Sequence, residues 1–136
     1  MRPTPSIASA ILTLLAASCV TTPPARGKVD FAREVKPLLE ARCLPCHRGD
    51  ALPGLPDFRD RAGMIGAGYL VPGNAAASRV IQVTQLRDDQ IGAMPPTGHA
   101  LAASEIELLT RWIDEGADWP EGEQLHQKRG AEPRSR

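Results

Sequence analysis

Between positions 30 and 120, apolar residues recur mainly at helical spacing, in short runs separated by stretches rich in glycine and proline. The first run consists of Phe31, Val35, Leu38 and Leu39. This spacing predicts a helix that Asp30 caps and that ends at Cys43. Because Pro37 lies inside the run, the helix must either kink there or restart with Pro37 in its first turn.

Two short helices are predicted in the middle of the chain, where the apolar runs are brief. We expect Asp57 to cap one that ends near Gly66, and Ser78 to cap another. The positions of the second that should face inward are Val80, Ile81 and Leu86. Glycine and proline favour turns and loops in residues 49–56, 71–74 and 92–98.

The last predicted helix has the clearest boundaries. Ser104 and Glu107 have the pattern of a capping box at its start, and Gly116 ends it. Its apolar face consists of Ile106, Leu109, Trp112 and Ile113. Since no segment shows the alternating pattern of a β-strand, the chain is expected to be all-α.

The length of 136 residues suits one domain. Residues 30–120 are expected to form it, because the flanking segments lack a helical apolar period. Residues 20–29 are predicted to be a polar linker that contains proline, and residues 121–136 a charged, disordered tail.

Residues 1–19 have the pattern of an export signal. The apolar run 7–17 follows Arg2 and is too short for a permanent membrane-spanning helix. Residues 15–19, Leu-Ala-Ala-Ser-Cys, resemble a bacterial lipoprotein signal, in which Cys19 becomes the lipid-bearing first residue of the mature chain. The protein is therefore expected on the periplasmic side of a bacterial membrane, anchored by lipid. The alternative is an ordinary signal cleaved before Val29, which would remove Cys19.

The strongest chemical signal is Cys43-Leu44-Pro45-Cys46-His47, which has the Cys-x-x-Cys-His form that attaches a c-type haem. The two thiols can each add to one vinyl group of a porphyrin, and the adjacent imidazole supplies an axial ligand to the iron. The chain has only two Trp, two Phe and one Tyr for a core, and a fixed porphyrin would supply the missing apolar body. The 16 basic residues balance the 16 acidic ones, so nothing indicates a nucleic-acid partner.

Three other interpretations of Cys43 and Cys46 fit the sequence less well. A thioredoxin-like redox pair needs a βαβ context, which the pattern lacks. A structural disulfide would leave His47 unexplained. A zinc site needs four ligands, and the remaining candidates, His99 and His126, lie at spacings unlike those of zinc ribbons.

Met94 is the candidate for the opposite face of the iron. It lies in a loop between Gly92 and Pro95-Pro96, where the prolines restrict the backbone and would hold a weak thioether ligand. His99 is the rival ligand, and Met64 is expected to pack in the core. Arginines that could pair with the haem propionates are Arg79, Arg87 and Arg111, and the sequence does not choose among them.

Residues 30–120 resemble a class I c-type cytochrome domain and are most similar to the Planctomycete cytochrome C family. The matching pieces are residues 35–39, 43–47, 71–74 with Ser78, 94–96 and 112–120. The resemblance implies three to five short helices around one covalently bound haem, with the first and last helices crossing beside it. It also implies thioether links at Cys43 and Cys46, with His47 and Met94 as axial ligands.

The function expected from this resemblance is that of an electron carrier and not of an enzyme. Ligands on both faces leave the iron no open position for a substrate. The partners would be transient redox proteins, and the protein is expected to be a monomer. One alternative is a haem-based sensor or peroxidase-like domain with a labile ligand at Met94. Another is a haem-free binding module that keeps Cys43 and Cys46 as a disulfide.

Overall fold

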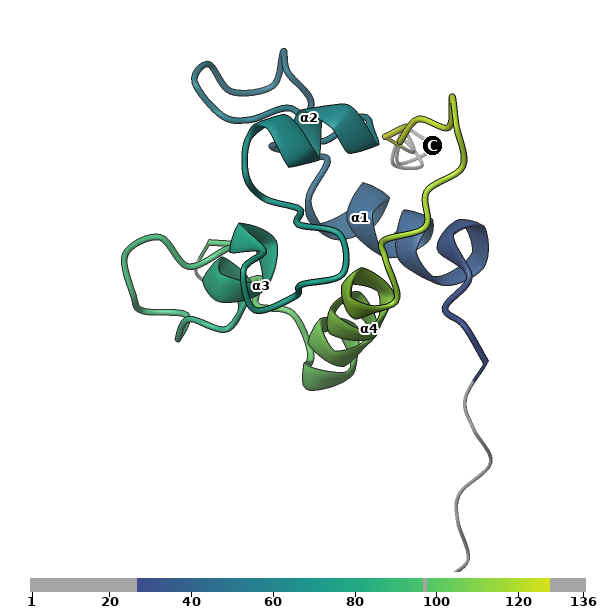
Figure 1. Ribbon diagram of the computed structural model, residues 1–136. Helices are drawn as coiled ribbons and strands as arrows, with labels where there is room; N and C mark the ends of the chain where they lie inside the picture. The colour runs from purple at the N-terminus through teal and green to yellow at the C-terminus, as the bar shows by residue number, and fades with distance from the viewer. Residues whose placement is uncertain (1–26, 97, 128–136) are drawn as a thin grey trace, which may run out of the picture.

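The computed structural model describes residues 27–96 and 98–127 (Figure 1). Its helices are the π-helical turn η1 (Phe31–Val35), α1 (Lys36–Arg42), α2 (Arg61–Gly66), α3 (Arg79–Thr84) and α4 (Ala103–Asp114). No strand occurs in these residues, which agrees with the all-α prediction. The predicted export signal, Cys19 and residues 20–26 of the linker lie outside them.

The first helix restarts at its proline. Asp30 caps η1 as predicted, since its Oδ1 accepts a hydrogen bond from the Arg33 N–H at 3.0 Å. The α-helix α1 then begins at Lys36 with Pro37 in its first turn, where the missing N–H of proline costs no helical hydrogen bond. Of the two predicted outcomes, restart is therefore the one that occurs.

Helix α2 begins four residues after the predicted cap. Asp60 caps it, with Oδ1 accepting from the Gly63 N–H at 2.8 Å. The prediction of Asp57 as the cap was wrong. Asp57 instead pairs with Arg59 at 2.6 Å. The chain is still outside the helix at this point because Phe58 is buried and donates its N–H to the carbonyl of His47.

Ser78 was predicted to cap α3. It does precede the helix, but its side chain makes no capping hydrogen bond. Its hydroxyl accepts from the Val71 N–H and donates to the Asn74 carbonyl, both at 2.9 Å, and so closes the preceding turn. The buried residues of α3 are Val80, Ile81, Val83 and Thr84. Leu86 is 36% exposed, contrary to the prediction, because the helix has already ended at Thr84.

Helix α4 begins at Ala103, one residue before the predicted cap. The Glu105 carboxylate accepts from the Ala102 N–H at 2.7 Å, so half of a capping box is present two residues earlier than expected. Ser104 and Glu107 were therefore wrongly assigned as the box. The predicted end at Gly116 is confirmed, since this residue has a φ of 105°, which glycine adopts without strain.

The predicted apolar face of α4 packs against the first helical segment of the domain. Leu109, Trp112 and Ile113 are buried, and Ile106 packs partly against them. The ring of Phe31 in η1 lies 5.8 Å from Trp112 and 4.5 Å from Trp119. The first and last helical segments are thus packed together around three aromatic rings. No helix in the described ranges is long and apolar enough to cross a membrane.

The packed domain continues past the predicted boundary at residue 120. Leu125 is only 2% exposed, and its N–H donates to the carbonyl of Arg59 at 2.7 Å. The next residue, His126, donates its N–H to the buried Glu40 carboxylate at 3.0 Å. The prediction missed this segment because one leucine in a charged run creates no periodicity. The rest of the predicted tail, residues 128–136, lies outside the described residues.

We expect Leu125→Ala to lower the free energy of unfolding by about 2–5 kcal/mol, as truncation of a buried leucine does. Urea unfolding of the purified protein measures the change. The matched control is Gln124→Ala at the exposed neighbouring position, which should change it by less than about 0.5 kcal/mol. Equal effects of the two substitutions would show that residues 121–127 do not contribute to the core.

Candidate haem-binding site

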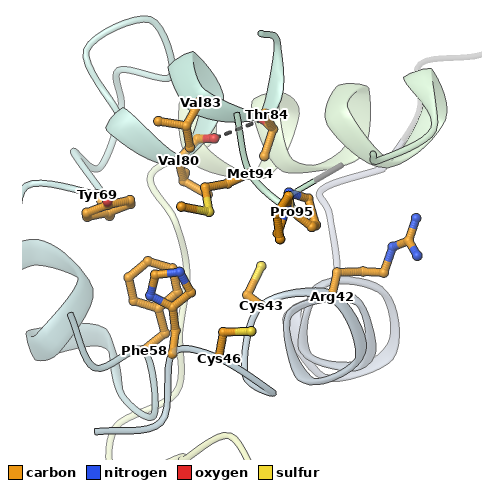
Figure 2. A pocket seen from close by; sticks show the side chains of 12 residues that line it. Arg42, Cys43, Cys46, Phe58, Tyr69, Val80, Val83, Thr84, Met94 and Pro95 are labelled. Carbon is orange, nitrogen blue, oxygen red and sulfur yellow. Dashed lines mark hydrogen bonds between the residues drawn. The ribbon is translucent and has the colours of Figure 1, made fainter. Parts of the chain in front are cut away.

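One pocket brings together the four residues that the sequence predicts to hold a haem (Figure 2). It contains about 440 Å³ of empty space, part of it open to solvent. The lining residues are Arg42, Cys43, Cys46, His47, Phe58, Tyr69, Val80, Val83, Thr84, Met94, Pro95 and Pro96. Most of them are apolar, as a bound porphyrin requires.

The Cys-x-x-Cys-His motif continues α1 as a helical turn. The N–H of Cys46 donates to the Cys43 carbonyl at 3.2 Å, and the N–H of His47 donates to the same carbonyl at 3.0 Å. Residues three and four apart lie on one side of such a turn. The turn therefore presents both sulfur atoms and the imidazole to the pocket, and Figure 2 shows the two cysteines on the same wall.

The Cys43 thiol is poorly suited to disulfide exchange. Burial raises its pKa to about 12, and the charge of the neighbouring Arg42 opposes this shift only in part. The thiolate is the nucleophile in exchange reactions, so a thiol with this pKa is nearly inert at neutral pH. The environment therefore disfavours a thioredoxin-like role for Cys43 and Cys46, which are both free thiols in the structure.

The zinc alternative gains no support from the described part of the chain. No group of three or more His, Cys, Asp or Glu side chains in it is arranged to hold a metal ion. A structural zinc site needs four such ligands. Haem iron differs, because the porphyrin supplies the four equatorial nitrogens and the protein adds only axial donors.

His47 is oriented as a metal ligand would be. Its side chain is buried, and its Nδ1 lies 3.0 Å from the carbonyl oxygen of Pro56. Because a carbonyl can only accept, Nδ1 is the donor in this contact, and Nε2 is the nitrogen left for a metal. The ring stacks on Phe58, with centroids 4.2 Å apart and planes 10° apart. This hydrogen bond and the stacking hold the imidazole in the tautomer and orientation suited to a ligand.

Met94 enters the pocket from the side of α3. Its backbone N–H donates to the Val83 carbonyl at 3.0 Å, and a cis peptide bond joins it to Pro95. Figure 2 shows its side chain directed into the pocket. Thr84, on the same wall, donates its hydroxyl to the Val80 carbonyl at 2.9 Å, so α3 itself satisfies this polar group. Met94 thus presents its thioether in largely apolar surroundings.

The other methionine and histidines considered as ligands lie outside the pocket. Met64 is fully buried in the core, as predicted. His99 and His126 are exposed. Neither histidine lines the pocket, and neither is placed as a rival to Met94.

Five pocket residues were not found by sequence reasoning: Arg42, Phe58, Tyr69, Val83 and Thr84. Phe58 and Tyr69 form aromatic walls, with ring centroids 5.0 Å apart. Arg42 lies at the rim and donates to the Ala100 carbonyl at 3.1 Å and to Glu105 at 3.2 Å. The scarcity of aromatic residues was a usable signal for Phe58 and Tyr69. For Arg42 the sequence held no signal other than its position next to Cys43.

Comparison with known proteins agrees with this site. The family model described as Planctomycete cytochrome C matches residues 43–98. The match begins at the first cysteine of the motif and extends past Met94, so it covers all four predicted haem-binding residues. It confirms the resemblance identified from the sequence. No curated protein and no solved structure matches the chain.

Proposed function

We propose that this protein, whose residues 43–98 are similar to the Planctomycete cytochrome C family, is an exported carrier of single electrons with one covalently bound haem c. The family match indicates a haem-binding electron carrier. The observation that supports the finer proposal is the convergence of Cys43, Cys46, His47 and Met94 on one largely apolar pocket.

The cysteines would attach the haem without any change of oxidation state in the protein. Each thiol adds across a vinyl double bond, so that sulfur bonds to one carbon and the thiol hydrogen ends on the other. With both sulfur atoms on one wall, Cys43 and Cys46 would hold a porphyrin by one side and so would limit its rotation in the pocket. Such an attachment survives denaturation, in contrast to a haem held by axial ligands alone.

His47 and Met94 would fill the two axial positions of the iron. An imidazole and a thioether together raise the reduction potential, because the soft sulfur donor favours ferrous iron. With both positions taken, the iron has no site for a substrate, and the protein only binds, shields and tunes the haem. This arrangement favours electron transfer over the sensor or peroxidase alternative.

The proposed setting of this activity rests on the signal pattern in residues 1–19. A signal ending at Cys19 would place the domain on the periplasmic side of a bacterial membrane, anchored by lipid at that residue. The polar residues 20–29 would then serve as the tether between membrane and domain. Donor and acceptor would be redox proteins that dock transiently, with the protein itself a monomer.

Potentiometric titration of the purified exported protein tests the proposed function. We expect one reversible one-electron transition at a positive potential, because a thioether ligand stabilises ferrous iron. Carbon monoxide added to the reduced protein should leave its absorption spectrum unchanged. A potential well below zero, or rapid carbon monoxide binding, would show that the iron lacks a stable second ligand and would contradict a simple carrier role.

A further inference from the structure

We infer that Tyr69 and Arg79 form the binding site for the haem propionates, an assignment that rests on the proposed attachment of haem at Cys43 and Cys46. Covalent attachment fixes which edge of the porphyrin faces which wall. The two vinyl-derived groups of haem c lie on adjacent pyrrole rings, and the two propionates lie on the remaining pair. The propionates must therefore lie at the edge opposite the thioethers.

Tyr69 forms the wall that faces this edge. Figure 2 shows Cys43 and Cys46 on one side of the pocket and Tyr69 on the other, with Met94 between them. The Tyr69 ring also packs against the Phe58 ring at 5.0 Å, which limits its movement. A phenol at this place has an apolar ring for the porphyrin and a hydroxyl donor for a carboxylate.

Arg79, the first residue of α3, is held next to Tyr69. Its guanidinium carbon lies 5.7 Å from the centre of the Tyr69 ring. Two backbone hydrogen bonds fix this position, from Arg79 N–H to the Gly68 carbonyl at 3.4 Å and from Val80 N–H to the Tyr69 carbonyl at 3.1 Å. The side chain of Arg79 is exposed, so its guanidinium is free to reach a carboxylate at the pocket edge.

Within the described residues, neither the Tyr69 hydroxyl nor the Arg79 guanidinium has a hydrogen-bond or ion-pair partner. Other arginines considered for the propionates, or lining the pocket, already face carboxylates. These pairs are Arg42 with Glu105, Arg87 with Asp89 and Arg111 with Glu115. Arg42 is also excluded by its position, since it neighbours Cys43 on the thioether wall. Arg79 is therefore the arginine whose donors remain available at the correct edge.

This contact should raise the reduction potential of the haem. A propionate carries negative charge close to the iron and so favours the ferric state. The guanidinium offsets that charge and can donate two parallel hydrogen bonds to the carboxylate. Loss of Arg79 should lower the potential without loosening the haem, because the thioethers hold it.

The test compares the reduction potentials of exported, haem-stained Arg79→Gln and Arg87→Gln proteins. Arg87 is a matched control, being an exposed arginine that pairs with Asp89 and does not line the pocket. Titration at 1 M salt removes distant charge effects, since the Debye length is then about 3 Å. We expect Arg79→Gln to lower the potential at both low and high salt, and Arg87→Gln to leave it unchanged at high salt. Arg79→Lys, which keeps the charge, should shift it less than Arg79→Gln.

Tyr69→Phe provides the second, independent variant and should lower the potential in the same direction. If Arg79→Gln and Tyr69→Phe both have the wild-type potential at 1 M salt and full haem content, the propionate assignment is overturned while the proposed function stands. The same holds if Arg79→Gln and Arg87→Gln shift the potential equally. Wild-type protein without covalent haem would overturn the proposed function and this assignment together.

Discussion

We expect that replacing both Cys43 and Cys46 by serine leaves the protein with no haem that stays attached after denaturation. Serine has nearly the same size as cysteine, but its hydroxyl does not form the thioether links. The variant polypeptide should then give no haem-peroxidase stain on a denaturing gel, whereas the wild type should stain fully. An antibody to the chain shows whether the polypeptide is present in both samples.

The third cysteine provides the control for this experiment. Cys19→Ser removes the proposed lipid anchor but leaves the pocket thiols intact. This protein should keep its haem stain while losing its association with the membrane fraction. A double variant of Cys43 and Cys46 that still carries haem through denaturation would contradict thioether attachment at these residues.

Replacement of Met94 by leucine is expected to have the second large effect, on the iron itself. Leucine keeps most of the apolar volume of methionine but lacks the sulfur donor. The absorption band of methionine-bound ferric haem should disappear, and the reduced protein should bind carbon monoxide. The reduction potential should fall by on the order of 0.1 V, a fraction of the ~0.8 V range that axial ligands span.

Met64→Leu is the matched control for Met94→Leu. Met64 is fully buried in the core and does not line the pocket, so its replacement should preserve the band, the potential and the lack of carbon monoxide binding. If Met94→Leu retains the methionine-iron band, Met94 is not the ligand. If the wild-type protein itself lacks the band, the second ligand is not a methionine. His99, the rival in sequence, is exposed and would have to move to reach the iron.

The elements of the fold were predictable where one local signal dominated. Asp30 starts the first helix, Pro37 restarts it and Gly116 ends the last, because each acts through its own side chain or φ angle. The helix starts near Asp57 and Ser104 were misplaced by a few residues. In both cases an acidic residue close by, Asp60 or Glu105, makes the capping interaction instead.

The predictable part of the candidate site was the part that a short motif encodes. Cys43, Cys46 and His47 are neighbours in sequence, and their placement on one turn follows from helical geometry. Tyr69 lines the pocket from a separate segment, and the hydrogen bonds at the start of α3 hold Arg79 beside its ring. No periodicity in the sequence reports such a long-range contact. Leu125 was missed for the same reason, since its burial depends on the carbonyl of Arg59 and the surrounding core.

The most direct test of covalent haem attachment is the intact mass of the mature wild-type protein, measured after denaturation from cells able to mature c-type cytochromes. We predict a mass equal to the processed polypeptide, with any lipid, plus one haem. The Cys43 and Cys46 double serine variant should lack that increment. A denatured wild-type protein with the mass of its polypeptide and lipid alone would contradict the account.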